Sequence, residues 1–128
     1  MASRRDLKLP LDSTPYAADP RSRPAQAGLR DGLYAYVQDE TGVVFVVPDG
    51  QHIHPKVLGN GRPAMYAGDL TIDEGEISDI TNLSGTFQFD DPDGLCEVAE
   101  QFKRQGLIAR TGAIRFFPVD GGPPQVLG

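Results

Sequence analysis

The stretch LYAYVQDETGVVFVV, residues 33–47, decides the fold because it has the pattern of two β-strands joined by a tight loop. Residues 33–37 and 43–47 are rich in β-branched and aromatic side chains, which favour strands. The loop between them, at residues 39–42, ends in glycine, and a short loop of this kind is typical of a hairpin. The second run is apolar on both faces, so we expect it to lie inside the sheet and not at its edge.

A second hairpin is expected in AMYAGDLTIDEGEISDI, residues 64–80. Leu70 and Ile72 alternate with polar neighbours, which is the pattern of a half-buried strand. The loop at residues 73–75 ends in Gly75, and a glycine can adopt the left-handed conformation that a three-residue hairpin loop requires.

One helix is expected over residues 92–105. Asp91 can cap its start, and Pro92 suits the first helical position. Gly106 ends the helix because glycine tolerates the left-handed conformation found after a helix C-terminus. Apolar side chains recur at helical spacing and form one face of the helix: Leu95, Val98, Ala99 and Phe102.

Strands at residues 86–89 and 113–117 complete the expected set. Two hairpins and one helix predict an α+β fold, in which a curved, mostly antiparallel sheet packs against the helix. The sheet is either open or partly closed into a barrel. We expect residues 31–119 to form this single domain and residues 120–128 to form a flexible tail.

The first thirty residues differ in composition from the rest of the chain. Residues 1–30 contain four prolines and no steady periodicity, so they predict an extended arm. This arm holds six basic and three acidic residues, a net charge of +3, whereas residues 31–128 hold six basic and fifteen acidic residues, a net charge of −9. We expect the basic arm to dock on a partner protein or on a second copy of this chain. The acidic body argues against nucleic acid as a partner, because phosphate contacts need clustered Lys and Arg.

The composition also limits the cellular compartments in which we expect this protein. No stretch approaches the roughly 18 consecutive apolar residues of a membrane-spanning helix, and the N-terminus has no apolar signal region. The single cysteine, Cys96, allows no internal disulfide, which suits a reducing compartment. We therefore expect a cytoplasmic protein without membrane contact. Because Cys96 neighbours Leu95 on the helix, we expect it to be a buried structural thiol.

Several short motifs follow one another in the order of a known domain. They are His54, Leu58 and Gly61, then Ala67-Gly68, Glu74-Gly75 and Ser84-Gly85-Thr86-Phe87, before the helix. This order resembles the conserved β-rich domain of plant IQ-motif-containing calmodulin-binding proteins and of uncharacterised microbial relatives. The Ser-Gly-His-Tyr signature of that domain is altered to Ser-Gly-Thr-Phe here, so the resemblance implies architecture and no catalytic residue. The IQ segment lies outside the matching region, so calmodulin is not an implied partner.

The pair His52 and His54 is the strongest candidate for a metal site. In an extended chain both imidazoles lie on one face, and imidazole is a ligand for zinc, copper, nickel and iron. A third ligand would have to come from a distant carboxylate. A pair of loop histidines that titrate near neutral pH is the alternative interpretation, and no cofactor is expected.

A catalytic alternative uses Ser84 as nucleophile and His54 as base, as in a small enzyme or toxin-type domain. No Gly-x-Ser-x-Gly motif surrounds Ser84, because Asn82 stands where the first glycine would be. A turn between two strands accounts for the same residues. The sequence therefore leaves enzymatic activity open and leans against it.

Binding residues are expected among aromatic and arginine side chains, which are enriched in protein interfaces. The candidates are Tyr34, Tyr36, Tyr66, Arg21 and Arg23. The three tyrosines fit equally well in the core. The function that the sequence favours is a non-enzymatic protein-interaction module, with an acidic body and a basic docking arm.

Overall fold

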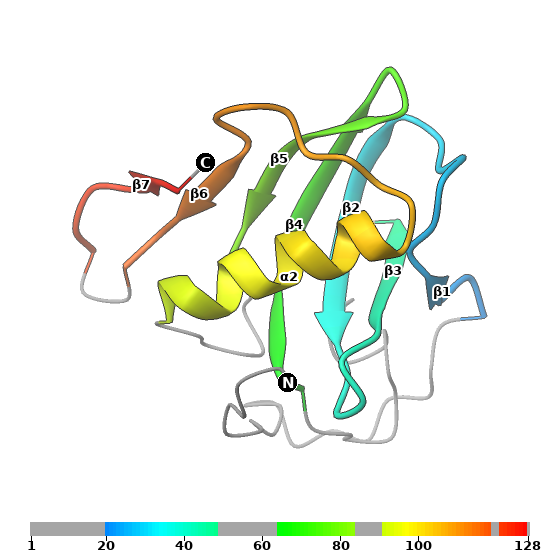
Figure 1. The fold of residues 1–128 in the computed structure, drawn as a ribbon, viewed down its shortest axis with the longest axis horizontal. Helices are drawn as coiled ribbons and strands as arrows, with labels where there is room; N and C mark the ends of the chain where they lie inside the picture. Colours follow the sequence, from blue (N-terminus) through cyan, green and yellow to red (C-terminus); the bar gives the residue numbers. More distant parts are fainter. Residues whose placement is uncertain (1–19, 49–63, 84–90, 119–120, 128) are drawn as a thin grey trace.

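A computed structural model of the chain describes residues 20–48, 64–83, 91–118 and 121–127. Its elements confirm the α+β class, with one helix and a mostly antiparallel sheet (Figure 1). The elements are β1 (Arg23–Pro24), β2 (Gly32–Gln38), β3 (Val44–Pro48), β4 (Tyr66–Asp73), β5 (Glu76–Thr81), α2 (Pro92–Arg104), β6 (Ile114–Phe116) and β7 (Gln125–Val126). The strand expected at residues 86–89 lies outside the described residues.

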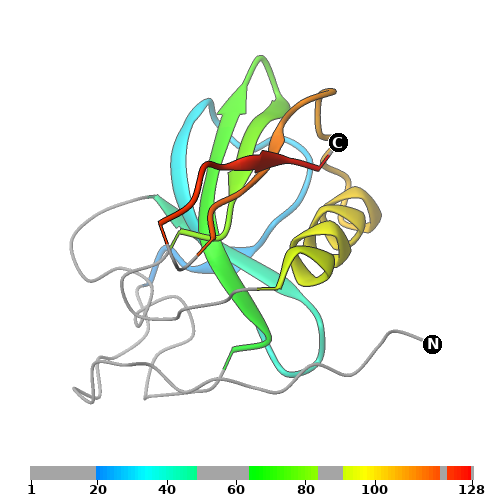
Figure 2. The ribbon, with the colours of Figure 1, turned by 90° about the vertical axis from the view of Figure 1, so that its left-hand side faces the viewer.

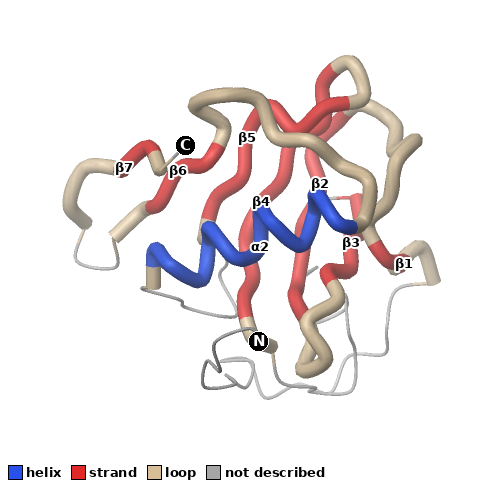
Figure 3. The backbone as a smooth tube through the Cα atoms, in the orientation of Figure 1, coloured by secondary structure: helices blue, strands red, loops and turns tan. Residues whose placement is uncertain are grey.

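The strands form one sheet of order β1-β3-β2-β4-β5-β6-β7. All neighbours pair antiparallel except β5 and β6, which are parallel because α2 carries the chain from one to the other. The sheet that these residues form is open, with β1 and β7 at its edges, so the closure into a barrel that we considered is not observed. Helix α2 crosses one face of the sheet and contacts β6, β4 and β3 (Figures 2 and 3).

The β2–β3 hairpin is organised by one buried carboxylate. The Asp39 Oδ1 atom accepts hydrogen bonds from the backbone N–H groups of Thr41 (2.9 Å) and Val43 (3.2 Å). The Asp39 and Val43 backbones pair at 2.9 Å across the loop, and Gly42 has a φ of 93°. The three-residue loop with a left-handed glycine confirms the hairpin that the sequence predicts.

The β4–β5 hairpin has a two-residue loop instead of the three-residue loop we expected. Glu74 and Gly75 both have positive φ, at 52° and 77°, as in a type I′ turn. This turn is favoured because its twist matches that of the two strands. The Asp31 carboxylate accepts hydrogen bonds from the backbone N–H groups of Glu74 (3.0 Å) and Gly75 (3.2 Å). These bonds offset the strain of a left-handed conformation at Glu74.

Helix α2 has the boundaries and the buried face that the sequence predicts. Asp91 is its extended N-cap residue, although the side chain makes no capping hydrogen bond, and Pro92 follows at the first helical position. Gly94 lies against the Tyr66 ring, where an added Cβ would come within 2.6 Å of a ring carbon. The helix N-terminus is therefore seated on β4 by a glycine-on-ring contact.

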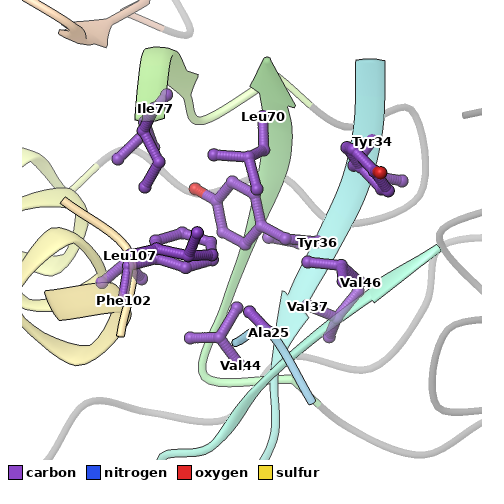
Figure 4. Packing of buried hydrophobic residues seen from close by; sticks show 14 of the residues in the cluster. Ala25, Tyr34, Tyr36, Val37, Val44, Val46, Leu70, Ile77, Phe102 and Leu107 are labelled. Carbon is purple, nitrogen blue, oxygen red and sulfur yellow. The ribbon is translucent and has the colours of Figure 1, made fainter. Parts of the chain in front are cut away.

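The core lies between α2 and the sheet face that α2 crosses (Figure 4). Tyr36 of β2 and Phe102 of α2 are both fully buried, and their rings pack edge to face with centroids 5.5 Å apart. Ala35 and Val37 point to the other face of β2 and are buried as well. Strand β2 is thus buried on both faces and lies inside the sheet, between β3 and β4.

The folded unit starts before residue 31, where we expected the domain to begin. Within residues 20–30, strand β1 pairs with β3, and Ala25 donates its backbone N–H to the Val44 carbonyl at 2.9 Å. Ala25 and Leu29 are buried in the core. Residues 20–30 are thus part of the sheet and the core, and only residues 1–19 of the expected arm lie outside the described chain.

The folded unit also continues past residue 119. Strand β7 pairs antiparallel with β6, and the Leu127 backbone N–H donates to the Ile114 carbonyl at 2.8 Å. The Leu127 side chain packs against the core, whereas Val126 is exposed. The segment that we expected to be a flexible tail therefore supplies an edge strand.

No helix in the described ranges is long and apolar enough to cross a membrane.

We predict that Gly68→Ala strongly destabilises the fold. A Cβ atom at Gly68 would overlap the Thr81 carbonyl and lie 2.9 Å from the Tyr36 hydroxyl. Gly68, Thr81 and Tyr36 belong to β4, β5 and β2, which are the three middle strands of the sheet. We therefore expect the free energy of unfolding to fall by about 3 kcal/mol, as measured by urea denaturation followed by circular dichroism. Thr71→Ala, in the same strand, is the control and should cost less than about 1 kcal/mol. Equal losses in both variants contradict the prediction.

Candidate functional site

The residues of the two chemical alternatives lie outside the described chain. His52 and His54 fall in residues 49–63, and Ser84 falls in residues 84–90. The metal site and the Ser-His pair therefore stay predictions. Among the described residues, no group of three or more His, Cys, Asp and Glu side chains is placed to hold a metal ion.

The three candidate tyrosines lie in the core. Tyr36 and Tyr66 are fully buried and Tyr34 is 6% exposed, so their rings form no outward-facing patch, and that expectation is corrected. The strand register places all three side chains on the sheet face that packs against α2. Each hydroxyl group donates to a backbone carbonyl: Tyr34 to Arg30 (2.6 Å), Tyr36 to Thr81 (2.7 Å) and Tyr66 to Asp91 (2.8 Å).

A buried polar group at the end of β5 is structural. The Asn82 side-chain amide donates to the Phe117 carbonyl (2.8 Å) and accepts from the Phe117 N–H (2.7 Å), so it continues the β5–β6 pairing beyond the strand end. The Thr81 hydroxyl oxygen accepts from the backbone N–H groups of Asp69 and Leu83. The sequence indicated only a turn at Asn82, because its pairing partner is 35 residues away.

Cys96 is exposed on α2, contrary to our expectation of a buried thiol. It follows Leu95 in sequence, but one helical step turns its side chain away from the core. Partial desolvation and then the negative charges of Asp93 and Asp91 raise the pKa of the Cys96 thiol. A raised pKa keeps the thiol protonated at neutral pH, which is the opposite of an activated nucleophile.

Two arginines on the β5–β6 side of the sheet are held in ion pairs. Arg110 bonds to the carboxylates of Asp73 (2.9 Å) and Glu76 (3.1 Å), and these hydrogen bonds raise its pKa. Arg115 holds Asp79 with two hydrogen bonds of 2.6 and 2.8 Å, which likewise raise its pKa. The positive charges of Arg110 and Arg115 are thus paired with acidic residues of the same sheet.

Residues 20–30 form the candidate interaction surface, which we name the basic edge. This segment contains Arg21, Arg23 and Arg30 and no acidic residue, so its net charge is +3. All three arginines are exposed, and Arg23 lies on the edge strand β1 (Figure 1). Residues 1–19 hold three basic and three acidic residues, so the whole net charge of the expected arm lies on the folded unit.

Sequence reasoning identified Arg21 and Arg23 but did not place them on the sheet. It missed Arg30, although the run of eleven residues without an acidic group is visible in the sequence. It also missed Gln105, whose side chain reaches the backbone of Ala25, directly after β1, and of Val44 in β3. No local pattern marks Gln105, because the residues that it contacts are 61 and 80 positions away.

Comparison with known proteins supplies no relative: no family model, no curated protein and no solved structure matches this chain.

We predict that Tyr36→Phe lowers the free energy of unfolding by about 1 kcal/mol, because the buried Thr81 carbonyl loses its hydrogen bond. Urea denaturation followed by circular dichroism measures the loss. Ser78→Ala is the control, since the hydrogen bond from its hydroxyl to the Thr71 carbonyl is long, at 3.4 Å, and should matter less. An unchanged midpoint for Tyr36→Phe would show that the carbonyl finds another donor.

We predict that Asp93→Asn speeds alkylation of Cys96 by iodoacetamide. Removing this negative charge lowers the thiol pKa, so more thiolate is present at a given pH. The rate is measured by mass spectrometry between about pH 7 and 10. Glu40→Gln, in the β2–β3 loop, removes the same charge elsewhere and should leave the rate unchanged. A rate in Asp93→Asn at or below that of the unaltered protein argues against the prediction.

Proposed function

We propose that this protein is a non-enzymatic protein-interaction module that docks on an acidic partner surface through the basic edge. The observation that carries the proposal is that residues 20–30 hold three exposed arginines and no acidic residue, and that one of them, Arg23, lies on the edge strand β1. Arginine is enriched in protein interfaces because its planar guanidinium pairs with carboxylates through two hydrogen bonds.

The charge distribution supports docking in one orientation. The basic edge carries +3, and the rest of the body, residues 31–128, carries −9. An acidic partner is attracted to the edge and repelled by the remaining surface, so it meets the protein from one side. Arg110 and Arg115 are paired with Asp73, Glu76 and Asp79, so acidic neighbours compensate these two positive charges locally.

The sheet edge favours side-chain recognition over strand addition at β1. Pro24 lacks a backbone N–H, and the strand is two residues long, which are both features that discourage pairing with a further strand. A partner at this edge therefore meets the arginine side chains and not a continuous backbone ladder. A second copy of the chain, with its acidic body, is one partner that satisfies this chemistry.

We predict that Arg21→Glu/Arg23→Glu reduces partner binding by tenfold or more, since each charge pair at such an interface contributes about 1 kcal/mol or more. A partner captured from the native host is purified, and its affinity is measured at low and at high salt. The salt dependence should weaken in the variant. Self-association is measured in parallel by light scattering.

The matched control is Lys103→Glu/Arg104→Glu, which makes the same charge change on the exposed last turn of α2. Deletion of residues 1–19 should also leave binding intact, because the three arginines remain. Equal losses from the two charge reversals would remove the basic edge from the mechanism. Turnover of a ligand by the purified protein would contradict its non-enzymatic character.

A further inference from the structure

Strand β3 is a strongly β-prone segment, and within the described ranges of the chain it has little cover on its outer side. Residues 43–47 read VVFVV and contain no charge. On the outer side, only two residues of β1 pair with β3, where Arg23 faces Val46 and Pro24 faces Phe45. An apolar, uncharged strand with few outer neighbours is a template for pairing with another chain.

The cover over β3 is completed by one side chain from the end of α2. The Val44 N–H donates to Gln105 Oε1 at 3.0 Å, and Gln105 Nε2 donates to the carbonyls of Ala25 (2.7 Å) and Val44 (3.0 Å). Gln101 Nε2 donates to Gln105 Oε1 at 2.8 Å and orients it. The Gln105 amide thus lies between Ala25, directly after β1, and Val44 of β3. It makes the hydrogen bonds that a backbone peptide group would make between paired strands.

Only some groups of β3 depend on this cover. Peptide groups of a strand alternate in direction, so the N–H and C=O groups of Val44 and Val46 point toward β1. Those of Phe45 and Val47 point toward β2 and are independent of the cover. Loss of β1 and of the Gln105 hydrogen bonds would therefore expose the N–H groups of Val44 and Val46 but not those of Phe45 and Val47.

We propose that β1 and the Gln105 amide form a strap over the β3 edge, and that this edge pairs with β3 of a second copy when the strap is displaced. Two antiparallel copies of VVFVV are self-complementary about a two-fold axis at Phe45. In that register Val44 faces Val46 of the second copy, and each such pair exchanges two backbone hydrogen bonds. Neither segment contains a charged residue, so no like charges face each other within the paired strands.

We expect residues 26–28 to act as a hinge that lets β1 move away from β3 while the rest of the sheet stays folded. Residues 26–28, which follow β1, are exposed, and Gly28 has a φ of 93°. Leu29 remains as a buried anchor after this turn. The proposal uses the backbone of β3, whereas docking uses the arginine side chains of the basic edge. Because β1 belongs to that edge, displacement of the strap also moves Arg23, and amide exchange in β3 distinguishes the two modes.

The test compares deletion of residues 1–25, which removes β1, with deletion of residues 1–19, which keeps it. Mass is measured by light scattering at two concentrations about tenfold apart. Amide hydrogen exchange is followed by NMR at Val44, Val46, Phe45 and Val47. A milder variant, Arg23→Pro/Gln105→Ala, keeps the buried Ala25. It removes a backbone N–H of β1 and the side-chain amide that bonds Val44 and Ala25. Its control is Arg23→Lys, which keeps both.

The proposal expects dimers in the two strap variants and not in their controls. In the monomer at low concentration, the deletion removes the β1 backbone opposite Val46, and the double variant removes the Gln105 acceptor of the Val44 N–H. Val46 in the deletion and Val44 in the double variant should therefore exchange about tenfold or more faster than in the control. At high concentration both amides should become protected, whereas Phe45 and Val47 stay protected throughout. If the deletion fails to fold, the double variant decides by the same criteria. Variants that stay as monomeric as their controls, or dimers in which Val44 and Val46 still exchange rapidly, overturn it.

Discussion

The close approach of β2, β4 and β5 at Gly68 is the constraint on which the rest of the structure depends. Tyr36 faces Gly68 across the sheet, and its hydroxyl reaches over to the Thr81 carbonyl at 2.7 Å. Only a residue without a side chain leaves room for both groups. The aromatic ring covers the glycine and then supports Phe102, so one contact joins three strands to the helix.

The helix is fixed at both ends by contacts that the sheet provides. At its start, Gly94 rests on the Tyr66 ring, whose hydroxyl holds the Asp91 carbonyl. At its end, the Gln105 amide bridges Ala25, directly after β1, and Val44 of β3. Because α2 spans the sheet from the β6 side to β3, its position also decides how the first edge strand is held. The position of α2 that covers the core thus also places Gln105 against the β1–β3 edge of the sheet.

The functional proposals both concern this edge but use different groups. The arginines of residues 20–30 offer positive side chains to an acidic surface, whereas the backbone of β3 offers hydrogen-bonding groups that β1 covers. Electrostatic attraction acts over about 10 Å and selects the partner's charge, whereas strand pairing needs direct contact and exposed peptide groups. The two modes are therefore separable in the molecule and sensitive to different changes.

The sequence by itself determined the two hairpins, the α+β class and a helix at residues 92–105, which the structure ends one residue earlier, at Arg104. Hairpin turns and helical periodicity depend on neighbours a few positions apart, so they can be recognised locally. The sequence also carried the net charge of residues 20–30. Only the tertiary structure decided that this segment joins the sheet, that the candidate tyrosines are buried and that Cys96 is exposed. The physical reason is distance along the chain: Ala25 is held by Gln105, 80 residues away, and a contact of that separation leaves no local pattern in either segment.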